Sequence, residues 1–216
     1  MDIAAIFDMD GVIADNGEFH QKAWEEFSQR HNLSFSKEKF KNDYFGRTNE
    51  QVLPELFGKE LTGEEIHQLG DEKEAIYREI YRPHLKPIPG LIDFLEELHK
   101  NEIPVGVATS APQDNVDFIL DGLGINKFIM TVVTDSMVKN GKPHPEIYLK
   151  AAELLKTAPD NCVVFEDSMS GTKSAYDAGS RIVAITTTLP AEKHKYAHQV
   201  VPDFEGMSLR FIKNLF

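Results

Sequence analysis

The sequence predicts an α/β protein in which a doubly wound parallel sheet carries an inserted all-helical domain. Three observations predict this fold. Short apolar runs with almost no charge recur along the 216 residues, and amphipathic stretches with helical periodicity lie between them. Residues 15–84 contain no such run, so this block is expected to be helical throughout.

The apolar runs predict the strands. They are largely β-branched and four to six residues long, as strands buried on both faces of a parallel sheet are. The runs cover residues 3–7, 103–108, 130–133, 162–165 and 181–185, and a shorter strand is expected at 199–201. The one cysteine, Cys162, is expected to be a buried strand residue and not a reactive thiol.

Amphipathic helices are predicted between the strands, because apolar residues recur there every three or four positions. The stripes comprise Leu91, Phe94, Leu95 and Leu98; Val116, Ile119, Leu120 and Leu123; and Ile147, Tyr148, Ala151, Leu154 and Leu155. Gly179 is placed to end one more helix, over residues 170–178. Ligands of doubly wound sheets bind at the carboxyl ends of the strands, so a site is expected there.

The chain is therefore expected to form two domains. Residues 1–14 and 85–216 would make the sheet domain, and residues 15–84 an all-helical cap domain. Helices of the cap are predicted near 18–32, 49–56 and 62–81. The last of them begins with Thr62-Gly63-Glu64-Glu65, which has the spacing of a capping box.

The formal net charge is −12, from 23 basic and 35 acidic residues. This charge argues against nucleic acid and anionic membranes as partners, since both require a positive field. No apolar stretch approaches the ~18 residues of a membrane span, and no signal peptide is recognisable. A single cysteine allows no internal disulfide. We expect a cytoplasmic protein, and the high charge favours a monomer.

Polar residues follow the predicted strands where they end. They are Asp8 and Asp10 after the first run, Thr109 and Ser110 after the second, Lys142 shortly after the third, and Glu166 and Asp167 after the fourth. One acidic pair would be compatible with a turn. Groups on several strand ends of a parallel sheet converge on one edge, and this convergence predicts a functional site.

Charge repulsion constrains the ligand of this site. Two like charges about 4 Å apart cost roughly 4 kcal/mol at an effective dielectric of 20. Four carboxylates beside one lysine would therefore protonate or move apart without compensation, and a bound divalent cation is the simplest way to compensate them. The candidate ligand atoms are all oxygens, with no thiolate and no histidine pair among them. Such a ligand set favours Mg²⁺ over Zn²⁺. Lys142 and the Thr109 hydroxyl can then hold a small anion beside the metal. This combination describes a phosphoryl-transfer site.

The same residues carry a family resemblance. Asp8-Met9-Asp10-Gly11-Val12, Thr109, Lys142-Pro143 and Glu166-Asp167 resemble, in this order, the four signatures of the haloacid dehalogenase (HAD) superfamily. The stretch GKPHPEIY at 141–148 and the position of the helical insert are similar to the β-phosphoglucomutase-like branch. The likeness spans about residues 3–187. It implies a Rossmann-like core with the first strand central, and a mobile helical cap.

The resemblance implies a role for each matching residue. Asp8 would be the nucleophile that forms an aspartyl-phosphate, and Asp10 the general acid/base. The side chains of Asp8 and Asp167 and the backbone carbonyl of Asp10 would hold Mg²⁺, with Glu166 behind them. Thr109, the backbone amide of Ser110, and Lys142 would bind the oxygens of the transferring phosphoryl group.

Residues of the insert are candidates for substrate binding. Lys73 lies on an apolar stripe, and since lysine is rarely buried without a partner, it either snorkels at the edge of the cap or meets the substrate. His20 shares a stripe with Trp24, another candidate, and is either a core histidine or a functional one. In the β-phosphoglucomutase-like branch, a histidine and a lysine at matching places assist proton transfer and substrate binding.

Two departures from the mutase pattern favour a phosphatase. The mutases present an arginine in the cap loop for a second phosphate, whereas the aligned residue here is Asn49, with Arg47 two positions earlier. Ala111-Pro112-Gln113 also replaces a serine and a lysine after Ser110. We expect a Mg²⁺-dependent phosphatase acting on a small phosphorylated metabolite, a sugar phosphate, with a β-phosphoglucomutase-type mutase as the alternative. A non-catalytic phosphoacceptor or binding module ranks third, and Asp10 and Asp167 argue against a dehalogenase.

Overall fold

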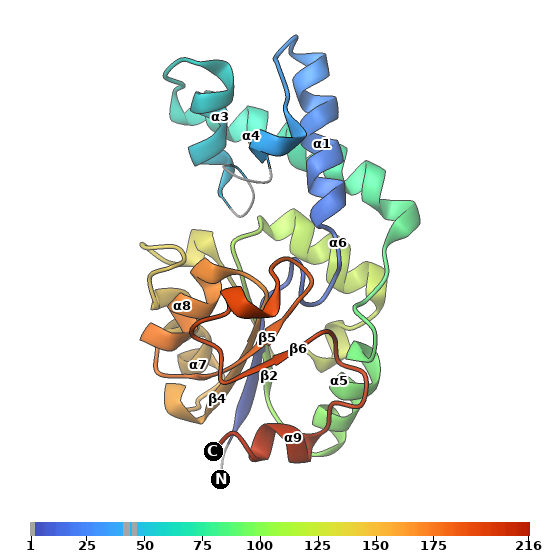
Figure 1. The fold of residues 1–216 in the computed structure, drawn as a ribbon, viewed down its shortest axis with the longest axis vertical. Coiled ribbons are helices and arrows are strands. Elements are labelled where there is room, and N and C mark those ends of the chain that lie inside the picture. Colours follow the sequence, from blue (N-terminus) through green and yellow to red (C-terminus); the bar gives the residue numbers. More distant parts are fainter. Residues whose placement is uncertain (1–2, 41–43, 45–46) are drawn as a thin grey trace. The chain divides into compact units, whose positions relative to one another are not determined.

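The computed structural model describes residues 3–40, 44 and 47–216. The chain forms two compact units, Met1–Asp15 with Lys86–Phe216, and Asn16–Leu85. These boundaries lie one residue from the predicted ones. Figure 1 follows the chain through both units, which are described separately below. That the smaller unit acts as a cap stays a prediction.

The larger unit is built on a six-stranded parallel sheet with the order β3-β2-β1-β4-β5-β6. The strands are β1 (Ala4–Phe7), β2 (Val105–Thr109), β3 (Thr131–Thr134), β4 (Cys162–Glu166), β5 (Arg181–Ile185) and β6 (Gln199–Val201). β1 is central and pairs with β2 on one side and β4 on the other. The predicted α/β class and the central place of the first strand are confirmed.

Helices of this unit lie on both faces of the sheet (Figure 1). They are α5 (Leu91–Lys100), α6 (Gln113–Leu123), α7 (Glu146–Leu154), α8 (Met169–Asp177) and α9 (Leu209–Lys213). Short 3₁₀ turns lie between the elements of the chain at Arg82–His84, Asn126–Phe128, Asp135–Met137, Pro159–Asn161 and Ala191–Lys193. Gly179, with φ +85°, follows the end of α8, as the sequence predicts.

Each face of the sheet has its own core, because successive strand residues point to opposite faces. On one face Ile6 packs with Tyr148 of α7, Ala175 of α8 and the buried Cys162. On the other face Phe7 stacks on Phe165 with ring centroids 4.6 Å apart, and Phe94 and Phe204 complete an aromatic cluster. The two cores fix β1 and β4 side by side.

The smaller unit is helical over its described residues. It contains α1 (Gly17–Arg30), the single turn α2 (Lys37–Lys39), α3 (Asn49–Phe57) and α4 (Gly63–Tyr81). The capping box of α4 forms as predicted: the Thr62 N–H donates to Glu65 Oε2 over 2.8 Å, and the Glu65 N–H donates to Thr62 Oγ1 over 3.2 Å. Phe27, Tyr77 and Tyr81 are among its fully buried side chains.

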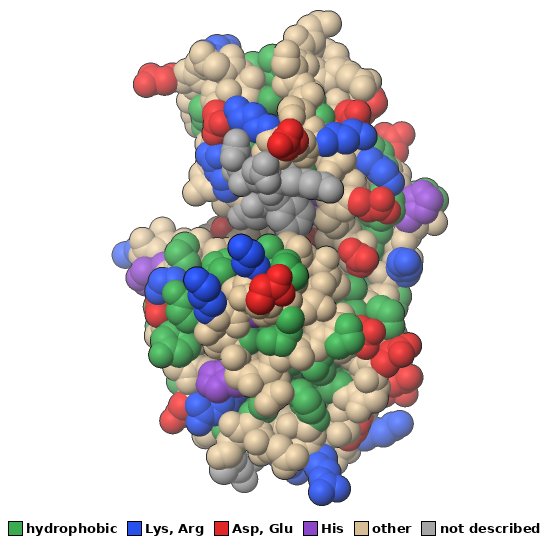
Figure 2. Space-filling view, in the orientation of Figure 1, with side chains coloured by type: hydrophobic (Ala, Val, Ile, Leu, Met, Phe, Trp, Pro, Cys, Tyr) green, Lys and Arg blue, Asp and Glu red, His purple; other side chains and the backbone are tan. Residues whose placement is uncertain are grey.

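The surface carries mixed charge. In the space-filling view of Figure 2, acidic and basic side chains are interspersed over the face shown. None of the helices described is long and apolar enough to cross a membrane. The absence of nucleic-acid partners stays a prediction from the net charge of −12.

Candidate active site

Three buried carboxylates meet at the carboxyl ends of β1 and β4. Asp8 directly follows β1, Glu166 ends β4, and Asp167 follows it. The register places Phe7 opposite Phe165, and the Asp8 N–H donates to the Phe165 carbonyl over 2.9 Å. Each residue offers a carboxylate oxygen, and these oxygens lie within 4.8 Å of one another. Pairing of two parallel strands thus brings together acidic residues that are far apart in the sequence.

Lys142 links two of these carboxylates. It lies in the loop before α7, and its Nζ donates to Asp8 Oδ1 over 2.6 Å and to Glu166 Oε1 over 2.7 Å. A third hydrogen bond of 3.2 Å reaches the Ala108 carbonyl at the end of β2. Although burial lowers the pKa of Lys142, the charges of Asp8 and Glu166 hold it well above its usual value. The lysine is therefore a permanent positive charge in the cluster.

Both oxygens of Glu166 accept several hydrogen bonds. Oε1 accepts from Lys142 and from the Tyr148 hydroxyl, 2.9 Å away. Oε2 accepts from the N–H groups of Asp167 and Ser168 and from the Ser168 hydroxyl, each over 2.9 Å. Burial raises the pKa of Glu166, but Lys142 and these donors bring it below the ordinary value. An ionised carboxylate with five donors is better suited to orient Lys142 than to bind a cation directly.

The pKa values of Asp8 and Asp167, unlike that of Glu166, lie above the ordinary value. Burial, with the charges of Glu166 and Asp10 adding and that of Lys142 opposing, raises the pKa of Asp8 to about 7. Burial and the charges of Glu166 and Asp8 raise the pKa of Asp167 well above its usual value. A bound cation would relieve both effects, because it favours the ionised carboxylates. The donor set holds only oxygens, so it fits Mg²⁺.

The remaining predicted residues of the larger unit lie in the same loops. Asp10 is half-buried in the turn after β1, and its charge acts on Asp8. Thr109 is the buried last residue of β2, and its Oγ1 accepts a hydrogen bond from the Ala111 N–H over 3.0 Å. The exposed Ser110 turns its hydroxyl to Asp135 Oδ1, 3.2 Å away. The predicted role of Ser110, binding of a phosphoryl oxygen, uses its backbone amide and not this hydroxyl, and it stays a prediction.

Three polar residues of this site, Tyr148, Thr187 and Thr188, were not among the predicted ones. Tyr148 was assigned only to the apolar stripe of a helix, but its hydroxyl reaches Glu166. Thr188 donates a hydrogen bond to Asp167 Oδ2, and Thr187 donates one to the Gly11 carbonyl. The signal for both threonines was present, since Thr186-Thr187-Thr188 directly follows the strand at 181–185, as the other site residues follow theirs.

The smaller unit has a polar network of its own around Lys73. The Lys73 side chain is 3% exposed, so of the two alternatives predicted for it, snorkelling at an edge is excluded. Its Nζ lies 2.9 Å from His20 Nδ1 and 2.9 Å from Glu74 Oε1, over the ring of Trp24. Asn49 donates to the same Glu74 oxygen over 3.0 Å. A neighbouring carboxylate, absent from our prediction, thus compensates the buried ammonium.

Arg47 is engaged elsewhere in the smaller unit. Its guanidinium forms an ion pair of 3.0 Å with Glu55 and donates to the Gln51 carbonyl over 2.9 Å. Four of the predicted insert residues therefore belong to one network, namely His20, Trp24, Asn49 and Lys73. Arg47 lies outside it and contacts residues of α3. Whether these residues bind substrate stays a prediction.

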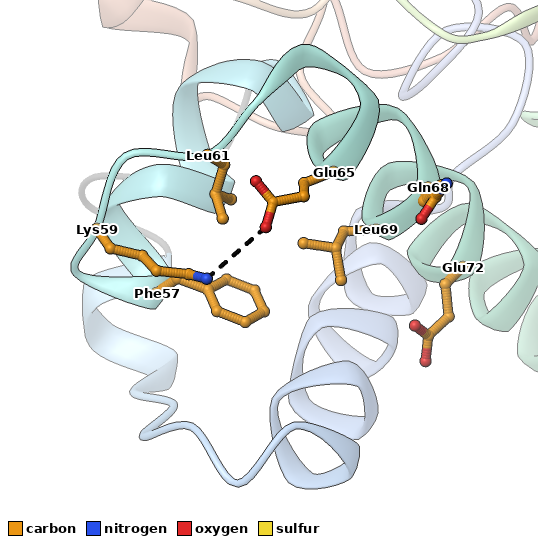
Figure 3. A pocket seen from close by; sticks show the side chains of 7 residues that line it. All are labelled: Phe57, Lys59, Leu61, Glu65, Gln68, Leu69 and Glu72. Carbon is orange, nitrogen blue, oxygen red and sulfur yellow. Dashed lines mark ion pairs between the residues drawn. The ribbon is translucent and has the colours of Figure 1, made fainter.

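A separate pocket of about 310 Å³ lies within the smaller unit (Figure 3). Phe57, Leu61 and Leu69 line it with Lys59, Glu65, Gln68 and Glu72. Lys59 and Glu65 form a long ion pair of 3.9 Å across it. None of the residues predicted to bind substrate lines this pocket.

Comparison with known proteins identifies the family. The family model of haloacid dehalogenase-like hydrolases matches residues 5–185, which is most of the chain and includes every strand-end residue of the cluster. The chain belongs to this family. The predicted superfamily, and the prediction of an enzyme, are thereby confirmed.

Several HAD relatives match over most of their length. A phosphorylated carbohydrates phosphatase of Thermotoga maritima is 32% identical over 86% of this chain and 86% of its own length. A β-phosphoglucomutase of Bacillus subtilis is 30% identical over 84% of this chain and 82% of its own. One longer relative, from Arabidopsis thaliana, is 27% identical, and the chain covers 57% of its length.

A solved structure supports the same assignment. The crystal structure of a HAD hydrolase of family IA, variant 3, from Entamoeba histolytica superimposes with a TM-score of 0.91. It is 28% identical to this chain, and the match covers 99% of this chain and 98% of that one. The HAD fold therefore extends over both units of the chain.

Proposed function

We propose that this chain is a Mg²⁺-dependent phosphatase that hydrolyses a small phosphomonoester, a sugar phosphate, through an aspartyl-phosphate on Asp8. The observation that carries the proposal is the contact of Lys142 with both Asp8 and Glu166, beside Asp167. This arrangement supplies a nucleophilic carboxylate, a fixed cation for phosphoryl oxygens and a set of oxygen ligands for a metal.

The reaction would proceed in two displacements. A carboxylate oxygen of Asp8 attacks phosphorus, the bond from phosphorus to the ester oxygen breaks, and Asp10 protonates the leaving oxygen. Asp10 then takes a proton from water, whose oxygen attacks the phosphorus and releases inorganic phosphate and the Asp8 carboxylate. Lys142, Thr109 and the Ser110 amide would hold the phosphoryl oxygens throughout.

The metal ligands would be the side chains of Asp8 and Asp167 and the backbone carbonyl of Asp10. A bound Mg²⁺ would neutralise charge on the phosphoryl oxygens. Glu166 would act through Lys142, since its own oxygens accept hydrogen bonds from five donors. This role agrees with the expectation that Glu166 lies behind the ligands.

A β-phosphoglucomutase-type reaction is the second candidate, because it uses the same aspartyl-phosphate and one relative carries that name. A mutase must also hold a second phosphate. Asn49 and Arg47, the residues considered for that task, each contact a carboxylate in the smaller unit, Glu74 and Glu55 respectively. Acidic neighbours oppose the binding of an anion, which favours the phosphatase.

We further propose that His20, Trp24, Lys73 and Asn49 contribute to binding the leaving group, with Arg47 the weakest candidate of the insert. The support is that the first four form one network around a buried charge. Alanine substitution of His20 should raise the KM for the sugar phosphate more than the KM for p-nitrophenyl phosphate. Equal effects on both substrates would remove His20 from the binding residues.

The decisive experiment is phosphate release from p-nitrophenyl phosphate with Mg²⁺ and with EDTA. A panel of sugar phosphates, nucleotides, phosphoglycolate and pyrophosphate should then identify the substrate, beside an isomerisation assay on β-glucose 1-phosphate. We expect Mg²⁺-dependent hydrolysis that the variant Asp8→Asn abolishes. Retention of a tenth of the wild-type kcat by this variant would refute the covalent mechanism. Isomerisation faster than hydrolysis would establish the mutase instead.

A further inference from the structure

Two threonines after β5 contact two different loops of the acidic cluster. The Thr188 hydroxyl donates a hydrogen bond to Asp167 Oδ2, in the loop after β4. The Thr187 hydroxyl donates one to the Gly11 carbonyl over 2.5 Å, in the loop that carries Asp8 and Asp10. A single segment of the chain thus connects the loops that follow β1 and β4.

Gly11 packs directly against the Asp167 carboxylate. A Cβ at Gly11 would lie 1.9 Å from Asp167 Oδ2 and 3.2 Å from Thr188 Oγ1, and the φ of +79° favours glycine there. Asp167 Oδ2 therefore lies between the Gly11 backbone and the Thr188 hydroxyl. A carboxylate held in this way has a restricted rotation about its Cβ–Cγ bond, so the direction of its other oxygen is also restricted.

We propose that Thr188 is a positioning residue for the cation, which acts by orienting Asp167, and that Thr187 supports it by tying the Gly11 loop to the same segment. The inference rests on the proposed function in one respect, namely that Asp167 is a metal ligand. Hydrogen bonds to a ligating carboxylate fix its orientation before the metal binds, and their loss typically costs about 10- to 100-fold in metal affinity or activity.

A substitution series in the 186–188 segment can test this role. Thr188→Val removes the hydroxyl and keeps the shape, Thr188→Ala removes it with less volume, and Thr188→Ser keeps it. Thr186→Val is the matched control, because the Thr186 hydroxyl makes no hydrogen bond within the part of the chain that the structure describes. The readout is the rise in unfolding temperature with MgCl₂ in the absence of substrate, which gives an apparent Kd for Mg²⁺.

We expect Thr188→Val and Thr188→Ala to raise the Kd for Mg²⁺ by about tenfold or more, and Thr188→Ser and Thr186→Val to stay within about twofold of the wild type. The Mg²⁺ concentration for half-maximal hydrolysis should shift in parallel. Unchanged Mg²⁺ affinity in a folded Thr188→Val or Thr188→Ala variant would overturn the positioning role. Equal weakening by Thr188→Ser would do the same, since the hydroxyl is retained.

The measurement needs no substrate, so the two proposals can fail separately. If the wild-type chain binds Mg²⁺ in a Thr188-dependent manner but hydrolyses no phosphomonoester, the proposed function fails and the positioning role stands. If hydrolysis requires Mg²⁺ but the Thr188 series does not alter its affinity, only the positioning role fails. A wild-type chain that Mg²⁺ does not stabilise would overturn both.

Discussion

At the scale of single residues, Lys142 uses every proton of its ammonium group. It donates to Asp8, Glu166 and the Ala108 carbonyl, and an ammonium has three protons to donate. In the proposed reaction, a phosphoryl oxygen that Lys142 binds would therefore have to replace one of these acceptors. The bond to Ala108 is the longest, at 3.2 Å, and is the one we expect to be exchanged. The hydrogen bond from Lys142 to Glu166 would keep the lysine in place during this exchange.

Asp10 can be tested through its dependence on the leaving group. The variant Asp10→Asn cannot protonate the leaving oxygen, so kcat with a sugar phosphate should fall by about 10²–10⁴-fold. The loss should be smaller with p-nitrophenyl phosphate, whose leaving group needs little protonation. Single-turnover rates on both substrates provide the measurement. An unchanged rate with the sugar phosphate would assign the proton transfer to another group.

The raised pKa of Asp8 predicts how Mg²⁺ binding depends on pH. Because the pKa in the metal-free protein is about 7, a proton occupies Asp8 at lower pH and must leave before the carboxylate can bind a cation. Mg²⁺ affinity should therefore rise with pH through about 7, by at most about tenfold per unit for each proton that must leave. Asp167 adds to this dependence, because burial and the charges of Glu166 and Asp8 also raise its pKa.

The check is the Mg²⁺-induced rise in unfolding temperature across a pH series, at constant ionic strength. Asp8→Asn removes one of the two titrating ligands, so the pH dependence of the weaker Mg²⁺ binding that remains in this variant reports on Asp167. A Mg²⁺ effect that is the same at about pH 5.5 as at about pH 8 would contradict the assignment of Asp8 as a ligand.

At the scale of elements, the site is made by loops at the carboxyl ends of adjacent strands. β1 and β4 bring Asp8 beside Glu166 and Asp167, and β2 supplies Thr109. Helix α8 then begins so close to Glu166 that its backbone packs on the carboxylate. A Cβ at Gly171 would lie 1.6 Å from Glu166 Oε1.

Gly171→Ala should therefore lower the free energy of unfolding, although a glycine-to-alanine change within a helix usually raises it. Alanine in a helix normally stabilises by about 0.4–1 kcal/mol relative to glycine, but here the displaced Glu166 should cost about 1–3 kcal/mol of unfolding free energy. Gly63→Ala in α4, whose Cβ meets nothing within 4 Å, should be neutral or stabilising. Urea unfolding of the two variants gives the comparison. The idea fails if Gly171→Ala is as stable as the wild type.

The helices and strands could be predicted because the sequence patterns that indicate them lie within a few neighbouring residues. The strand at 181–185 and the Thr62–Glu65 capping box follow from apolar runs and from spacing within one turn. The carboxylate cluster was also predictable, because its members follow strands whose carboxyl ends lie at the same edge of a parallel sheet. The contact of Tyr148 was not predictable, because the hydroxyl of a tyrosine on an apolar stripe finds its partner only when the helix packs on the sheet, here at Glu166.

At the scale of the whole molecule, the net charge opposes the substrate that we propose. A charge of −12 repels an anionic phosphomonoester at long range, while Lys142 attracts it only at the site. A cytoplasmic location and a monomeric state stay predictions from the same composition.

This repulsion predicts the effect of salt. Raising the ionic strength from about 20 mM to about 200 mM shortens the Debye length, so kcat/KM for a sugar phosphate should rise by about twofold or more at saturating Mg²⁺. The comparison uses a non-coordinating salt and a second measurement of the Mg²⁺ requirement at each ionic strength. A fall in kcat/KM would show that local cations dominate the approach of the substrate.

The sequence alone determined the fold class, the family resemblance and the strand-end residues, because hydrophobic periodicity and motif order can be observed along the chain. Only the tertiary structure decided which partners surround each charge. Glu74 beside Lys73, Tyr148 on Glu166 and Thr188 on Asp167 are such partners. The contacts of Tyr148 and Thr188 depend on how helices and loops pack. Glu74 is adjacent to Lys73 in the sequence, but it compensates a buried charge only because folding buries Lys73. A buried charge is stabilised by whatever donor or counter-charge the fold brings within about 3 Å, and sequence spacing does not encode that distance.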